Sequence, residues 1–128
     1  ISSNVMVGPI EPEANPLQLW LASLRKLDRL APDTLVLPSH QGVFRGLHAR
    51  VDQLIEHHDE RLADVMRACT EAPCHAAGLL EVLFKRKLDL HQMTFAMGES
   101  VAHLNALWLR GSLLRQLGAD GVYRFSAA

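Results

Sequence analysis

Residues 50–66 read RVDQLIEHHDERLADVM, and the apolar side chains in this stretch recur every three or four positions. That spacing places them on one face of an α-helix. Followed in both directions, the pattern predicts one long helix from about residue 47 to residue 69, and we expect this helix to bridge two parts of the chain. The expected buried stripe consists of Val51, Leu54, Ile55, His58, Leu62, Val65, Met66 and Cys69.

The segment before the long helix carries signals for another helix and for short strands. Asn15 followed by Pro16 is a favourable helix start, because the Asn side chain accepts from free backbone amides and Pro tolerates the first turn. Pro32 ends that helix, since its ring disfavours the helical conformation at the preceding residue. Residues 34–37 predict a short buried strand, and residues 1–7 predict a strand or strand end. Helix and strand at this spacing indicate an α/β fragment.

After the long helix the pattern predicts two more helices and a hairpin. The helices span about residues 74–84 and 90–110, and Gly111 stands where a helix C-terminal glycine belongs. Two short runs, 113–117 and 122–125, flank the turn sequence GADG and predict a β-hairpin. Three helices followed by a hairpin is the order of a winged helix. The sequence therefore predicts a mainly α chain with minor β structure.

Composition narrows the classes of protein to consider. The chain has 128 residues, of which 48% are apolar, 13 are basic and 14 are acidic, so its net charge is -1. This is enough apolar material for the core of one ordinary domain, and the charge gives no general attraction to nucleic acid. No apolar run approaches the roughly 20 residues of a membrane helix, so no membrane partner is expected. Cys69 and Cys74 match neither a zinc pair nor a disulfide framework, which favours a cytoplasmic location.

The loop VLPSHQGVF, residues 36–44, presents His40 just beyond the expected strand. Loops at strand ends in α/β sheets are frequent sites of ligand and metal binding, and neutral imidazole is a common metal donor. A single loop histidine is, however, more often a solvated or capping residue. From the residues alone, both interpretations of His40 stay open.

Three stretches together indicate a family. NPLQLWLASLRKLDRLAPDT, LVLPSHQG and RVDQLIEHHDERLADVM resemble the C-terminal part of metallo-β-lactamase-fold hydrolases, which often read LPGHG and then carry a helix with an HH-xx-R pattern. The later winged-helix pattern is similar to the C-terminal extension of one branch of that superfamily. The resemblance implies a remnant of the catalytic domain at residues 1–58 and a winged-helix-like subdomain at residues 59–128.

The resemblance also implies roles for residues in the loop. His40 matches the last histidine ligand of the family's two-zinc site, and Ser39 and Gln41 replace the glycines that usually flank it, which implies a place at the site rim. The family's HxHxDH motif, middle histidine and bridging aspartate are absent from this sequence. No catalytic residue is therefore assigned here, and we expect the chain to be inactive alone.

By the same resemblance, the parent protein is a zinc-dependent hydrolase with two zinc ions in its site. Its small-molecule substrate would be a thioester, a lactam or a phosphodiester. The partner that completes the site would be the N-terminal remainder of the catalytic domain, which holds the other metal ligands.

His57 and His58 are adjacent, so on a helix their side chains point about 100 degrees apart and cannot chelate one ion together. We expect His58 to pack at the seam between the two parts of the chain, with His57 and Arg61 partly solvated. A place for these three residues at the rim of the active site is the alternative.

The winged-helix pattern raises a different class of function, a DNA-binding or interaction module. The helix expected to enter a groove has no Lys or Arg before Arg110, and Lys85, Arg86 and Lys87 form the one basic cluster of this region. We therefore expect no nucleic-acid partner, while a homodimer stays open as an alternative. The positions expected to be exposed on that helix are Gln92, Thr94, Glu99, Ser100, His103 and Asn105, whereas Phe95 is expected in the core, with exposure as the alternative.

Overall fold

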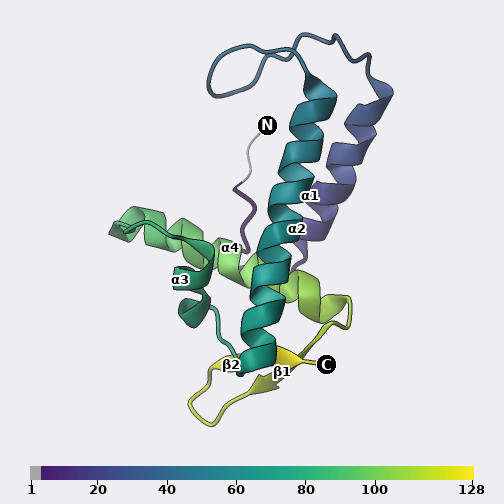
Figure 1. The fold of residues 1–128 in the computed structure, drawn as a ribbon. Coiled ribbons are helices and arrows are strands. Elements are labelled where there is room, and N and C mark those ends of the chain that lie inside the picture. The colour runs from purple at the N-terminus through teal and green to yellow at the C-terminus, as the bar shows by residue number, and fades with distance from the viewer. Residues whose placement is uncertain (1–3) are drawn as a thin grey trace.

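The long helix α2, Leu47–Glu71, is the element around which the chain is arranged (Figure 1). The computed structural model describes residues 4–128, which are mostly helical and contain one two-stranded antiparallel sheet. The expectation of a mainly α chain with minor β structure is confirmed. The other elements are α1 (Pro16–Arg25), the 3-10 helices Lys26–Arg29 and Ala77–Leu79, α3 (Leu80–Leu83), α4 (Leu90–Leu109), β1 (Leu113–Leu117) and β2 (Tyr123–Ala127).

Helix α1 begins where its sequence predicts. The side chain of Asn15 accepts a hydrogen bond from the backbone amide of Gln18, and Pro16 occupies the first turn. Leu17 and Leu24 are both buried: Leu24 packs in a cluster with Leu47, Val51 and Leu54 of α2, and Leu17 belongs to the larger core cluster that also includes residues of α2 and α4. Complete burial of a leucine such as Leu17 contributes about 1.5–3 kcal/mol, so these contacts hold α1 against its neighbours.

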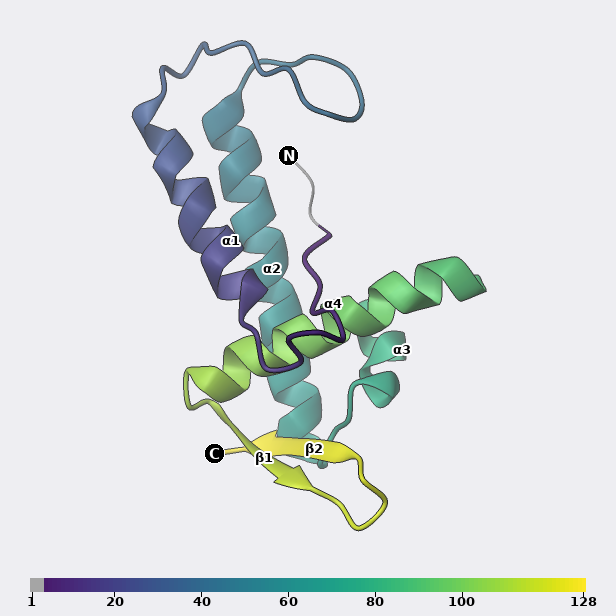
Figure 2. The same ribbon diagram turned by 180° about the vertical axis from the view of Figure 1, so that it is seen from behind.

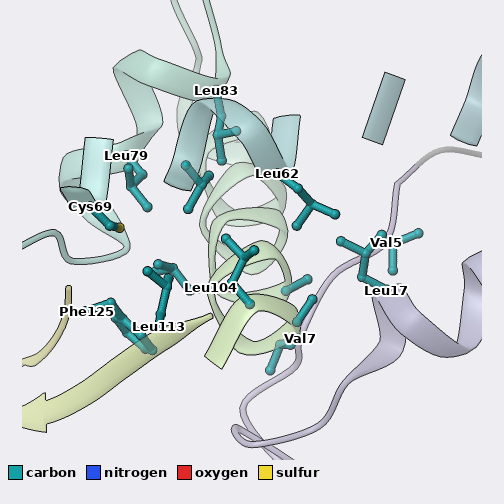
Figure 3. Close-up of a cluster of buried hydrophobic side chains, with 14 residues drawn as sticks. Val5, Val7, Leu17, Leu62, Cys69, Leu79, Leu83, Leu104, Leu113 and Phe125 are labelled. Atoms are coloured by element: carbon teal, nitrogen blue, oxygen red, sulfur yellow. The ribbon is translucent and has the colours of Figure 1, made fainter. Parts of the chain in front are cut away.

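The stripe expected on α2 forms the centre of the core. Its buried members are Val51, Leu54, His58, Leu62, Val65 and Cys69, preceded by Leu47. The first half of the stripe packs against α1, and the second half joins α3, α4 and the hairpin. Figure 3 shows Leu17 and Val5 on one side of Leu104 in α4, with Cys69 and Leu79 on the other. One core therefore joins the two ends of the chain.

The strand expected at residues 1–7 is wrong for the part that the structure describes. Residues 4–7 form no strand, and residues 1–3 lie outside the described residues. Val5 and Val7 are buried, but the amide of Val7 donates to the carbonyl of Gly98 on α4, 3.0 Å away. The apolar side chains are thus satisfied by a helix rather than by a neighbouring strand.

The buried strand expected at residues 34–37 is also wrong. Val36 and Phe44 form an isolated antiparallel bridge with hydrogen bonds of 2.8 and 3.1 Å. Leu35 and Leu37 are 46% and 74% exposed. The apolar run has no sheet to join in the described part of the chain, so it remains an irregular segment at the base of a loop.

The region after α2 is less helical than expected. Residues 74–76 are not helical, because Cys74 bridges to Phe125 of β2 through two hydrogen bonds of 2.8 Å. The predicted helix 74–84 is therefore reduced to the 3-10 turn Ala77–Leu79 and the single turn of α3. The hairpin is confirmed, with Leu113 paired to Ala127 and Leu117 paired to Tyr123.

Gly98 permits the close passage of the N-terminal segment over α4. A Cβ atom at this position would lie 2.8 Å from Cβ of Met6 and 3.1 Å from the carbonyl oxygen of Val7. We expect Gly98→Val to displace residues 6–7 and to lower the free energy of unfolding by about 1–3 kcal/mol, measured by urea denaturation. The matched control is Thr94→Val, an exposed position of the same helix. Equal stability losses in the two variants would contradict this packing.

Candidate functional site

The His40 loop, defined here as residues 30–46, connects α1 to α2 at the N-terminal end of α2 (Figure 1). Its base is held by the bridge between Val36 and Phe44, and by a contact of 2.9 Å between Nε2 of His48 and the carbonyl of Leu30. At its tip Ser39, His40 and Gln41 are exposed. The loop thus presents the imidazole of His40 outward from an anchored base.

The chain alone does not assemble a metal site in its described part. A structural or catalytic zinc needs three or four protein donors. Among residues 4–128, no group of three or more His, Cys, Asp or Glu side chains is placed to hold a metal ion. His40 is available as one donor, and the residues present do not fit a complete zinc centre.

The other histidines singled out from the sequence lie elsewhere on α2. His58 follows Leu47, the first residue of α2, by 11 positions, a rise of about 16 Å along the helix axis. His57 is exposed, Arg61 is half-buried and His58 is 2% exposed. His57, His58 and Arg61 therefore form a group separate from the tip of the His40 loop.

His58 is packed between helices. Its ring lies edge-on to Trp20 of α1, with centroids 5.0 Å apart, and is stacked on His103 of α4 at 5.4 Å. The Nδ1 atom of His58 lies 3.3 Å from Nε2 of His103, and Nδ1 of His103 lies 2.7 Å from the carbonyl oxygen of Glu99. These contacts tie α1, α2 and α4 together at one buried point.

The hydrogen-bond chain assigns the ring protons. A carbonyl only accepts, so Nδ1 of His103 donates to Glu99, and in a neutral ring Nε2 of His103 then accepts from Nδ1 of His58. Nε2 of His58 is left as an acceptor, and this buried atom has no hydrogen-bond partner among the described residues. The residue His58 also borders a cavity of about 10 Å³, together with Arg61 and Glu99.

Burial keeps this histidine pair neutral. Desolvation lowers the pKa of His58 to about 4, with further lowering from the neighbouring charges of His103, His57 and Arg61. The pKa of His103 is also lowered, mainly by burial, against an opposing effect of its bond to Glu99. Burial raises the pKa of the Glu99 carboxyl. The arrangement is a neutral hydrogen-bonded seam, which suits packing better than proton transfer near neutral pH.

Three polar residues of α4 lie inside the protein, contrary to expectation. Ser100, His103 and Asn105 were expected to be exposed, but they are 0%, 2% and 2% exposed. The signal that indicates their burial is the set of small residues on the same helix, Ala96, Gly98, Ala102 and Ala106, which lets other elements approach α4 on several faces. The C-terminal half of the face expected to read DNA is therefore inside the protein.

The helices and the hairpin of the C-terminal half can be compared with known protein families. A family model described as the metallo-beta-lactamase-like C-terminal domain matches residues 62–128, which is more than half of the chain. The chain therefore belongs to the metallo-beta-lactamase-like family, and its resemblance to the C-terminal part of such proteins is confirmed. A search of curated proteins gave no match.

Two solved structures show the same arrangement. A beta-lactamase domain protein from Burkholderia ambifaria is 56% identical, with a TM-score of 0.96, over 100% of this chain and 38% of its own. A metallo-beta-lactamase family protein from Thermus thermophilus is 30% identical, with a TM-score of 0.73, over 89% of this chain and 34% of its own. The chain thus spans less than two fifths of either relative.

Within residues 4–128, every helix is too short or too polar to cross a bilayer.

The buried histidine pair makes stability depend on pH. The pKa of His58 is 6.5 when unfolded and about 4 when folded, so between these values the unfolded chain binds a proton that the folded chain does not. The contribution of neutral His58 to the free energy of unfolding is complete above pH 6.5. As the pH falls toward 4, up to about 3 kcal/mol of this contribution is lost. We expect His58→Gln to reduce this loss, measured by urea denaturation at pH values spaced about one unit apart, from about 7.5 down to about 4.5.

The control for this experiment is His91→Gln, because His91 is an exposed histidine of α4. It should retain the pH dependence of the unchanged chain. If His58→Gln and His91→Gln show the same decline toward the acidic end of this range, the buried pair does not control acid stability.

Proposed function

We propose that this chain forms the C-terminal part of a metal-dependent hydrolase of the metallo-β-lactamase superfamily. The observation that carries the proposal is the likeness to the Burkholderia ambifaria beta-lactamase domain protein, which extends over 100% of this chain but only 38% of that protein. In such an enzyme, the remaining part of the catalytic domain supplies most of the metal ligands. The chain itself contributes the His40 loop and the helices that carry it, and is inactive alone.

His40 is proposed as one ligand of the metal centre. Its exposed position at the tip of an anchored loop supports this role, because the imidazole is free to meet donors from another segment. Ser39 and Gln41 flank it and would lie at the site rim. Bound zinc would lower the pKa of a water molecule and polarise the scissile carbonyl or phosphoryl oxygen.

Exposed apolar side chains around His40 support a contact between this loop and the remaining, N-terminal part of the catalytic domain. Leu35, Leu37 and Val43 are 46%, 74% and 63% exposed. Burying such residues against another part of the protein is favourable by about 25 cal/mol per Å² of apolar surface. The same surface that brings His40 to the metal would then be covered by the rest of the catalytic domain.

The division into a catalytic remnant at residues 1–58 and a winged-helix-like subdomain at 59–128 is part of the proposal. The family match beginning at residue 62 and the order α2, α3, α4 and hairpin support it. In this arrangement, His57, His58 and Arg61 stand at the seam. The substrate class is a thioester, a lactam or a phosphodiester, and the free thiols of Cys69 and Cys74 support a reducing, cytoplasmic setting.

The role of His40 is tested by His40→Ala in the longer natural protein. We expect the variant to lose metal from one site and to retain less than about one hundredth of the hydrolase activity, since changes to residues that only support a metal ligand already cost about 10–100-fold. Metal content per chain is measured by elemental analysis, and turnover by a panel of thioester, lactam and phosphodiester substrates. His91→Ala is the control. Full metal content and turnover in His40→Ala would refute the assignment.

The proposed contact around His40 predicts a context-dependent effect of Leu37→Asp. In the 128-residue chain we expect a change of less than about 0.5 kcal/mol in the free energy of unfolding, because Leu37 is largely exposed. In the longer natural protein the same change should cost at least about 2 kcal/mol, since it buries a carboxylate. Leu114→Asp, an exposed position of β1, should have a similar small effect in both. A small effect of Leu37→Asp in both proteins would contradict the contact.

A further inference from the structure

A large cavity lies at the opposite end of the molecule from the His40 loop. It has a volume of about 620 Å³, is partly open to solvent, and is bordered by α4, the hairpin, residues 75–77 and residues 12–13. Figure 2 shows the segment before α1 passing in front of α4 and above the hairpin. The apolar part of the lining consists chiefly of Met97, Val101, Leu104, Val122 and Phe125.

The walls of this cavity are fixed by long-range hydrogen bonds. The amide nitrogen Nδ2 of buried Asn105 donates to the carbonyls of Pro12 and Ala14, at 2.9 and 3.0 Å. The hydroxyl of Ser100 donates to the carbonyl of Ala76 at 2.8 Å. These bonds hold residues 12–14 and Ala76 on α4, and the bridge between Cys74 and Phe125 joins the segment before Ala76 to β2. The cavity is therefore a preformed feature of the fold.

The charged groups at the cavity are already neutralised by one another. Arg115 donates to Glu13 at 2.6 Å and lies over the rings of Trp108 and Tyr123, at 3.6 and 4.3 Å from their centroids. A second pair consists of Arg124 and Asp120, whose side chains form two hydrogen bonds of 2.7 and 2.9 Å. An ionic ligand would have to displace an existing partner from one of these pairs.

From this lining we infer that the cavity binds one small, uncharged, mainly apolar molecule. Its volume lies within the roughly 300–1,000 Å³ of small-molecule sites, and such sites combine an apolar lining with a few polar groups. The internal ion pairs make an uncharged ligand the better match, because a buried ligand charge would lack a free counter-charge. The site uses none of the residues proposed for metal binding, so it stands independently of the hydrolase proposal.

The test uses N-phenyl-1-naphthylamine, an uncharged aromatic probe whose fluorescence rises in apolar surroundings, added to the 128-residue chain. We expect saturable binding with one probe per chain. Val101→Trp fills the cavity and should weaken binding at least tenfold, whereas Phe95→Trp on the exposed side of α4 should leave it unchanged. Unsaturable binding, or equal binding by both variants, would overturn the site.

A second measurement avoids any variant. In the chain labelled with ¹³C at the methionine methyl groups, the probe should shift the signal of Met97, which lines the cavity, and leave that of Met66 in place. Shifts at Met66 but not Met97 would overturn the assignment. 1-Decanol should displace the probe at a concentration at least tenfold lower than decanoate does. Stronger displacement by decanoate would overturn the inference that the ligand is uncharged.

Discussion

The buried stripe of α2 is the constraint on which the rest of the structure depends. Its 25 residues give a helix about 37 Å long, and one face of it is buried from Leu47 to Cys69. Neither α1 nor the hairpin region has a core of its own, since the largest cluster takes residues from both ends of the chain, including Val5 and Phe125. Removing this face would therefore take from α1, α3, α4 and β2 the packing partner that they share.

The same helix places two chemically different regions at its ends. The N-terminal end carries the exposed His40 loop, with an imidazole and several uncovered leucines. The C-terminal end carries the hairpin, beside a cavity whose arginines are already paired with carboxylates. Between them, His58 and His103 are buried and neutral. The fold therefore fixes the spacing between the exposed His40 loop and the apolar cavity.

Sequence signals that act over a few residues predict the secondary structure correctly. Features that depend on contacts with distant parts of the chain are not predicted. The cap at Asn15 and the α2 stripe act within a few residues, so they were predictable. The run at 34–37 looks like a strand because it is apolar and β-branched, but a strand exists only where another strand pairs with it. His103 was predicted to be exposed because its burial depends on contacts with α2; the small residues of α4 indicate close packing but do not specify this partner. The family resemblance, which rests on the loop and the α2 motif, predicted the family, which the local patterns alone did not.

The most direct test of the functional account is the sequence of the natural gene upstream of the codon for Ile1. The account predicts an HxHxDH motif there, with further histidine and aspartate ligands that complete the metal site of His40. A coding region that begins close to Ile1 and contains no such motif would contradict the account. In that case, the helical subdomain with its hairpin and cavity would have to explain the function without metal-dependent hydrolysis.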